Sequence, residues 1–206
     1  MCSSDLGMWK SQISDDLVWK GQFEGMDFKI ALDRYRSPGW SWISVIDQVP
    51  NRTVGCVKND LRRRLYAGGQ EENVAYYVDR TLQLAQADAP FGRVLSGKVT
   101  LRARTVPLGS TGPRVDITRL RKDCNYHLTE DEESRLELLL MKFCSRWSMS
   151  VMDEVEEGYA SLILLRGDGG SFKRLGTYWA WSDAAAKQAK PMVDWENVEY
   201  REITLV

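Results

Sequence analysis

The sequence predicts an α+β fold in which antiparallel β-hairpins are each followed by a packing helix. Period-2 alternation of apolar and polar residues indicates strands at 27–35 and 40–46, with a turn between them. Apolar residues at helical spacing instead indicate helices at 71–87 and 130–147. Because a hairpin precedes a helix in both halves, we expect sheets that carry packing helices.

Composition restricts the class of protein. The chain has 206 residues, of which 43% are hydrophobic, enough to bury one sizeable core or two small ones. Its formal net charge of -1 supplies no global attraction to nucleic acid or to an anionic membrane, so any such attraction must be local. No apolar run approaches the roughly 20 residues that cross a bilayer. We therefore expect no membrane partner.

Residues 1–7 are predicted to be a non-native leader. The run Cys2–Leu6 resembles the translated end of a common sequencing adapter, which suggests metagenomic reads; a natural serine-rich start is the alternative. The remaining cysteines, Cys56, Cys124 and Cys144, are odd in number and widely spaced, which argues against a disulfide framework or a zinc site. These thiols indicate a reducing compartment, so a cytoplasmic location is expected. Cys144 is predicted to be buried.

Two subdomains are predicted, separated at Ala89–Gly92. Residues 8–88 would form an N-terminal hairpin and helix, joined by an earlier strand near 17–23. Residues 93–206 would form a hairpin, an amphipathic helix, a second hairpin, a short helix and a strand. The expected elements of this half are strands at 94–106 and 114–120, a helix at 130–147, strands at 159–165 and 172–181, a short helix after Ser182 and a strand at 198–205.

Local sequence features support several of these elements. Thr129 followed by Glu132 forms a capping box at the start of the predicted helix. Gly167–Gly170 supplies the turn of the second hairpin. Each half also carries a Trp-x-Trp pair, so two similar subdomains related by a remote duplication remain open, although the identity between the halves is too low to establish them. The pairs are Trp40/Trp42 and Trp179/Trp181, and both core packing and exposed stacking are open for them.

The stretch from Arg93 to Cys124 is a local basic patch, with eight Lys or Arg residues against two Asp residues. Lys98, Arg102 and Arg104 would share one face of a strand and could follow a phosphate backbone. The alternative is an ordinary polar outer face of a sheet, neutralised by later acidic residues. The predicted nucleic-acid-binding residues are Lys98, Arg102, Arg104, Arg119, Arg121, Lys122 and Trp40.

A second hypothesis is enzymatic. Asp16, followed by Asp27-Phe28-Lys29, resembles the Asp…(Asp/Glu)-x-Lys core of restriction-type nucleases. The resemblance implies that Asp16 and Asp27 hold Mg²⁺ and that Lys29 positions the attacking water. Without that resemblance Asp27 and Lys29 are a charge pair on the solvated face of a strand, and no cofactor is expected.

The leading prediction is a non-enzymatic interaction protein of phage, mobile-element or bacterial origin. It would bind nucleic acid or a protein partner through its sheet faces and the basic hairpin. The alternative is a Mg²⁺-dependent nuclease.

Overall fold

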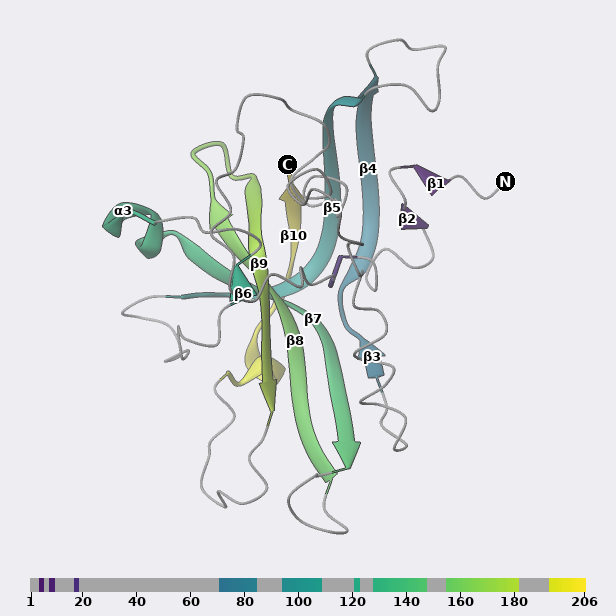
Figure 1. The fold of residues 1–206 in the computed structure, drawn as a ribbon, viewed down its shortest axis with the longest axis vertical. Helices are drawn as coiled ribbons and strands as arrows, with labels where there is room; N and C mark the ends of the chain where they lie inside the picture. The colour runs from purple at the N-terminus through teal and green to yellow at the C-terminus, as the bar shows by residue number, and fades with distance from the viewer. Residues whose placement is uncertain are drawn as a thin grey trace, which may run out of the picture.

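The computed structural model describes residues 4–5, 8–9, 17–18, 71–84, 94–108, 121–122, 128–147, 155–181 and 193–206. Nearly all of the regular structure in these ranges is β-strand (Figure 1). The elements are β1 (Ser4–Asp5), β2 (Met8–Trp9), β3 (Glu71–Asn73), β4 (Tyr76–Leu84), β5 (Val94–Pro107), β6 (Arg121–Lys122), α3 (Glu130–Ser134), β7 (Leu136–Trp147), β8 (Val155–Arg166), β9 (Phe172–Trp181), the 3₁₀ helix η4 (Trp195–Asn197) and β10 (Tyr200–Leu205).

One mixed sheet contains every strand from β3 to β10. The strands pair in the order β3-β7-β8-β9-β10-β5-β4, and β6 pairs separately with β9. A further antiparallel pairing joins β5 to β7, with Thr105 opposite Leu139. The pairings of β5, β7, β8, β9 and β10 therefore form a closed ring. In Figure 1 the β4–β5 pair and the β7–β8 pair extend from the middle of the molecule to opposite ends.

The interior of this ring is the first hydrophobic core. All five ring strands contribute to it, because every second residue of each strand points inward. Val99 and Leu101 of β5, Leu139 of β7, Leu162 of β8 and Leu205 of β10 are each 0% exposed. Complete exclusion of these side chains from water is the main contribution expected to stabilise the ring.

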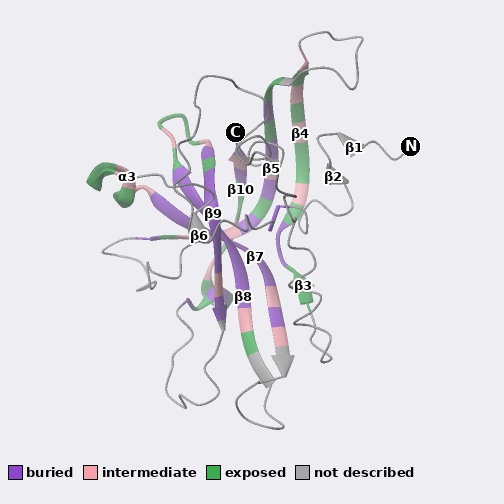
Figure 2. Cartoon of the chain, viewed as in Figure 1, coloured by how far each residue is buried: buried purple, intermediate pink, exposed green. Residues whose placement is uncertain are grey.

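A second core covers the outer face of β7, β8 and β9. Leu138 and Leu140 of β7 lie in it, together with Tyr159 and Tyr178. The η4 residue Trp195 packs edge-on against Tyr159, with ring centroids 5.5 Å apart. The central parts of β7, β8 and β9 are thus buried on both faces, whereas β4 is largely exposed (Figure 2).

The predicted α+β class is wrong. The expected helix at 71–87 is represented by strands β3 and β4, and most of the expected helix at 130–147 is strand β7. Only the capping box is confirmed there: Thr129 caps a five-residue helix, α3, and the Glu132 backbone N–H donates to Thr129 Oγ1 at 3.3 Å. Strand β7 is buried on both faces and so has a continuous apolar run, which apolar periodicity alone does not separate from a helix. In β4, register shifts between Tyr77 and Asp79 and between Gln83 and Leu84 interrupt the period-2 alternation that indicates a strand.

Several strand predictions are confirmed. The hairpin expected at 159–165 and 172–181 is β8 and β9, and its turn has Gly170 at φ 74, a conformation that glycine adopts without steric cost. The strands expected at 94–106 and 198–205 correspond to β5 and β10.

Other predictions lie outside the described residues. They are the first hairpin (27–46), the strand at 114–120, the short helix after Ser182 and the boundary at Ala89–Gly92. The strands on either side of that boundary, β4 and β5, pair with each other. No helix in the described ranges is long and apolar enough to cross a membrane.

Candidate binding face on strands β4, β5 and β10

Three neighbouring strands expose one polar face with aromatic residues. In the pairing register, Arg102 of β5 lies opposite both Tyr76 of β4 and Glu202 of β10, and Arg104 lies opposite Tyr200. Residues directly opposite one another project from the same side of a sheet. We call Tyr76, Val78, Arg102, Arg104, Tyr200 and Glu202 the tyrosine–arginine face.

The sheet itself orients this face outward. Leu101 and Ala103 alternate with the two arginines and are fully buried in the ring. Burial of these small and branched apolar residues leaves Arg102 and Arg104 no direction except the opposite side of β5. The prediction that Lys98, Arg102 and Arg104 share one face of a strand is confirmed, because Val99, Leu101 and Ala103 of β5 are buried on the other face.

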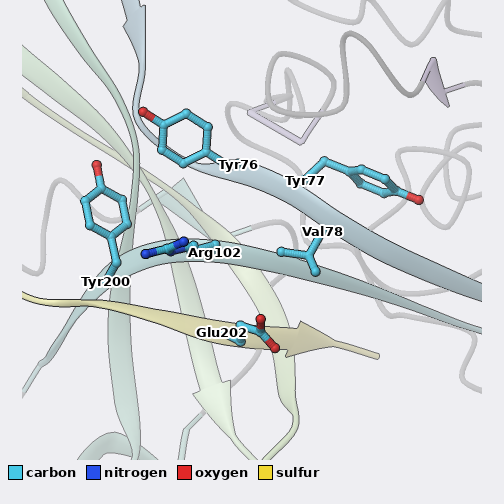
Figure 3. Close-up of a pocket in the computed structure, with 6 residues that line it drawn as sticks. All are labelled: Tyr76, Tyr77, Val78, Arg102, Tyr200 and Glu202. Carbon is cyan, nitrogen blue, oxygen red and sulfur yellow. The ribbon is translucent and has the colours of Figure 1, made fainter.

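An open cavity of about 480 Å³ lies on the face (Figure 3). Five residues of the tyrosine–arginine face line it, together with Tyr77. A register shift between Tyr77 and Asp79 places Val78 outside the regular ladder. Tyr76 is 53% exposed and Val78 is 43% exposed, so the cavity presents an uncovered aromatic ring beside an uncovered aliphatic group.

Two guanidinium groups lie close to the Tyr200 ring of this face. The guanidinium carbon of Arg104 lies 4.7 Å from the centroid of the Tyr200 ring, and that of Arg102 lies 6.0 Å away. Tyr76 and Tyr200 are themselves 6.0 Å apart and tilted by 44°. Such cation–π contacts hold guanidinium groups against a ring while leaving N–H donors for a ligand.

The rest of the outer face is polar. Lys98 is exposed farther along β5, and between it and Arg102 the Thr100 and Thr204 hydroxyls hydrogen-bond at 3.1 Å. Asp79 lies opposite Thr100 and is also exposed. The face therefore carries carboxylates as well as cations, which lowers its net charge.

The other predicted binding residues are not placed on this face. The backbone of β6, which contains Arg121 and Lys122, pairs with Thr177 and Gly176 of β9. Arg119 and Trp40 lie outside the described residues, as do Trp42 and the side chain of Trp181. Trp179 is partly buried and packs against the core inside the ring.

The residues of the enzymatic hypothesis, Asp16, Asp27 and Lys29, also lie outside the described ranges. Within those ranges no group of three or more His, Cys, Asp or Glu side chains could hold a metal ion.

Sequence reasoning missed Tyr76, Tyr200 and Glu202 as functional candidates. Tyr76 fell within a predicted helix, and nothing in the sequence indicates that residues 76, 102 and 202 meet across three strands. The one sequence signal for these residues is the alternation of polar and apolar residues in the final strand. It indicates that Tyr200 and Glu202 face outward, but it does not identify their neighbours on other strands.

A second polar cluster lies at the β5–β7 junction of the ring. The Glu137 side chain is 3% exposed, and both its carboxylate oxygens accept hydrogen bonds, Oε1 from Arg166 and Oε2 from Arg201. Arg201 also donates to Thr105 Oγ1, and both guanidinium groups lie 5.8 Å from the Phe172 ring centroid. These contacts join β5, β7, β8, β9 and β10, so we interpret the cluster as structural.

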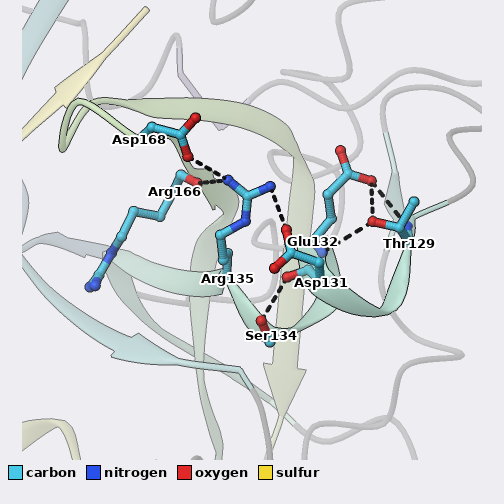
Figure 4. Close-up of polar contacts among 7 residues, drawn as sticks. All are labelled: Thr129, Asp131, Glu132, Ser134, Arg135, Arg166 and Asp168. Atoms are coloured by element: carbon cyan, nitrogen blue, oxygen red, sulfur yellow. Dashed lines mark hydrogen bonds and ion pairs between the residues drawn. The ribbon is translucent and has the colours of Figure 1, made fainter.

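Arg135 connects α3 to the β8–β9 turn beside this cluster (Figure 4). Its guanidinium donates to the backbone oxygen of Arg166 and to Asp168 Oδ1, each at 3.2 Å, and pairs with Asp131 at 2.9 Å. The Arg166 N–H donates in turn to the Arg135 carbonyl at 3.1 Å. Arg135 thereby positions the backbone of Arg166, one of the two arginines that hold Glu137.

The predicted burial of Cys144 is confirmed, although in a strand and not a helix. Burial raises the pKa of its thiol to about 12; the Glu71 carboxylate adds to this and the Lys142 ammonium opposes it. Lys142 and Glu71 form an ion pair at 2.8 Å that holds β3 against β7.

We expect the free energy of unfolding to fall as the pH rises from about 9 to about 12. In that window the unfolded chain releases the Cys144 proton while the folded chain retains it, at most about 1.4 kcal/mol per pH unit for one group. Burial raises the pKa of Tyr159 as well, which adds to the decline. Urea unfolding from pH 8 to 11 should give a shallower decline in Cys144→Ala; equal slopes would contradict this assignment.

Comparison of the chain with protein-family models, with curated proteins and with solved structures finds no match in any of the three.

Proposed function

We propose that the protein is a non-enzymatic binding protein for single-stranded nucleic acid and that the tyrosine–arginine face is its binding surface. The observation that supports this most directly is the packing of Arg104 on the Tyr200 ring beside the exposed Tyr76 ring. Guanidinium groups attract phosphates, and exposed aromatic rings stack on bases.

The aromatic rings favour an unpaired ligand. Bases in a duplex are stacked on one another and present only their edges, whereas an unpaired base can lie flat on a tyrosine. Tyr76 projects from a sheet face and not from a helix that could enter a groove. Stacking on such a ring contributes roughly 1–3 kcal/mol per base.

The cations favour a ligand with spaced negative charges. Lys98 lies on the same face of β5 as the two arginines, about 13 Å from Arg102, and Arg102 and Arg104 are about 7 Å apart. This spacing is close to the phosphate separation of an extended single strand. Asp79 and Glu202 on the same face oppose part of this attraction, so we expect moderate affinity.

Binding to short labelled DNA and RNA strands should weaken steeply with salt. With about three phosphate contacts, the slope of log affinity against log salt is about -2 for a single strand, a loss of about 20-fold between about 50 and about 200 mM. Arg102→Glu combined with Arg104→Glu should abolish binding at the higher salt concentration, measured by fluorescence anisotropy.

Matched variants test whether binding depends on this face or only on the net charge of the protein. Lys173→Glu on β9 changes the net charge as much as Arg102→Glu does, but it should leave the affinity within about twofold. Tyr76→Ala should weaken binding about tenfold, while Thr81→Ala, exposed on the same strand, should not. Affinity that survives the double arginine reversal would overturn the proposal.

The same titration, carried out with and without Mg²⁺, also measures cleavage of the nucleic-acid strand. Cleavage that depends on Mg²⁺ and is lost in Asp27→Ala would support the nuclease hypothesis. Absence of both salt-sensitive binding and cleavage would instead favour a protein partner for this face.

A further inference from the structure

The cavity of the tyrosine–arginine face is lined by two side chains of opposite charge, Arg102 and Glu202. Arg102 and Glu202 are direct neighbours in the β5–β10 ladder, yet within the described residues they form no ion pair. In Figure 3 the Arg102 guanidinium points toward Tyr200, while the Glu202 carboxylate points away from it. The cavity therefore offers hydrogen-bond donors at one end and acceptors at the other.

A carboxylate such as that of Glu202 is unexpected in a cationic site that binds nucleic acid. Glu202 opposes phosphate binding, so a ligand made of phosphates alone would be bound better without it. A base with adjacent N–H donors reverses this balance, because a carboxylate can accept two hydrogen bonds from it. Glu202 is thus suited to the base and not to the backbone of the ligand.

The four bases differ in what they present to a carboxylate. Guanine presents the N1–H and the N2 amino group side by side, whereas cytosine and adenine present one amino group beside an acceptor nitrogen. Uracil and thymine present one N–H between two carbonyl oxygens, which a carboxylate repels. The order of preference that follows from these patterns places guanine first and uracil or thymine last.

We infer that the cavity is a base-reading subsite for guanine, in which Glu202 accepts from N1–H and N2–H while the base packs on Tyr76 and Val78. The arginine end then faces the phosphates of the same strand. Bidentate contacts of this kind discriminate between bases by up to a hundredfold when enclosed, and the open cavity suggests about tenfold here. This inference rests on the proposed function.

The test compares eight-residue oligouridylates that carry one central substitution. The guanosine strand should bind about tenfold more tightly than the all-uridine strand, and an inosine strand, which lacks only the N2 amino group, should fall between them. In Glu202→Gln the ratio of guanosine to uridine affinity should approach one, while the uridine strand binds as well as before or better because a negative charge is gone.

Asp79→Asn is the matched control, because it removes one negative charge from the same outer face without touching the cavity lining. It should raise both affinities and preserve the ratio. Equal binding of guanosine and uridine strands to the unaltered protein would overturn the guanine subsite and leave the proposed function standing. No salt-sensitive binding of any strand would instead remove the proposed function itself.

Discussion

Leu138→Ala is expected to lower the free energy of unfolding by about 2–5 kcal/mol, the usual cost of a cavity at a buried leucine. Leu138 is 0% exposed in the core outside β7, and Met141 is 0% exposed on the other face of the same strand. Met141→Ala should cost a similar amount. Urea unfolding that reports both the midpoint and the slope would measure these losses.

These two positions discriminate between the strand and the predicted helix. In a helix whose apolar stripe contains Leu136, Leu139, Leu140, Phe143 and Trp147, residues 138 and 141 would lie on the opposite, solvated side. Truncation there would then cost less than about 0.5 kcal/mol. Leu95→Ala, at a position 43% exposed on β5, provides the matched control and should have little effect. Small losses at both Leu138 and Met141 would contradict strand β7.

Removal of both arginines around Glu137 should be as damaging as a core cavity. Arg166→Ala with Arg201→Ala leaves the Glu137 carboxylate buried without its two charged donors, and an uncompensated buried charge costs about 3–5 kcal/mol. The arginine side chains are 49% and 43% exposed, so their own removal from the surface contributes little of this.

A rescue variant tests whether the buried Glu137 carboxylate causes this loss of stability. Adding Glu137→Leu to the double arginine variant should restore much of the lost stability, because an apolar residue of similar volume needs no hydrogen-bond donors. Thermal and urea unfolding of the double and triple variants would measure the difference. If the triple variant is no more stable than the double variant, loss of packing on Phe172 explains the effect better than the isolated charge.

Local chemistry was enough to predict some elements of this protein. The turn at Gly167–Gly170 separates two apolar segments and predicts the β8–β9 hairpin, because the turn conformation is decided within a few residues. The Thr129 capping box predicts a helix start for the same reason. Alternation along β5 placed Lys98, Arg102 and Arg104 opposite Leu101 and its buried neighbours, and this part of the candidate site needed no partner strand.

The remaining structure depends on contacts between distant residues. The turn, the cap and the alternation of β5 follow from the sequence alone, because they all arise from neighbours along the chain. That residues 136–147 form a strand depends on contacts made in the folded protein. Strand β7 pairs with β5 and β8 and has a core on each face, so an extended conformation buries this apolar run better than a helix would. The same is true of the tyrosine–arginine face, since the register that joins Tyr76, Arg102 and Glu202 exists only once three strands are paired.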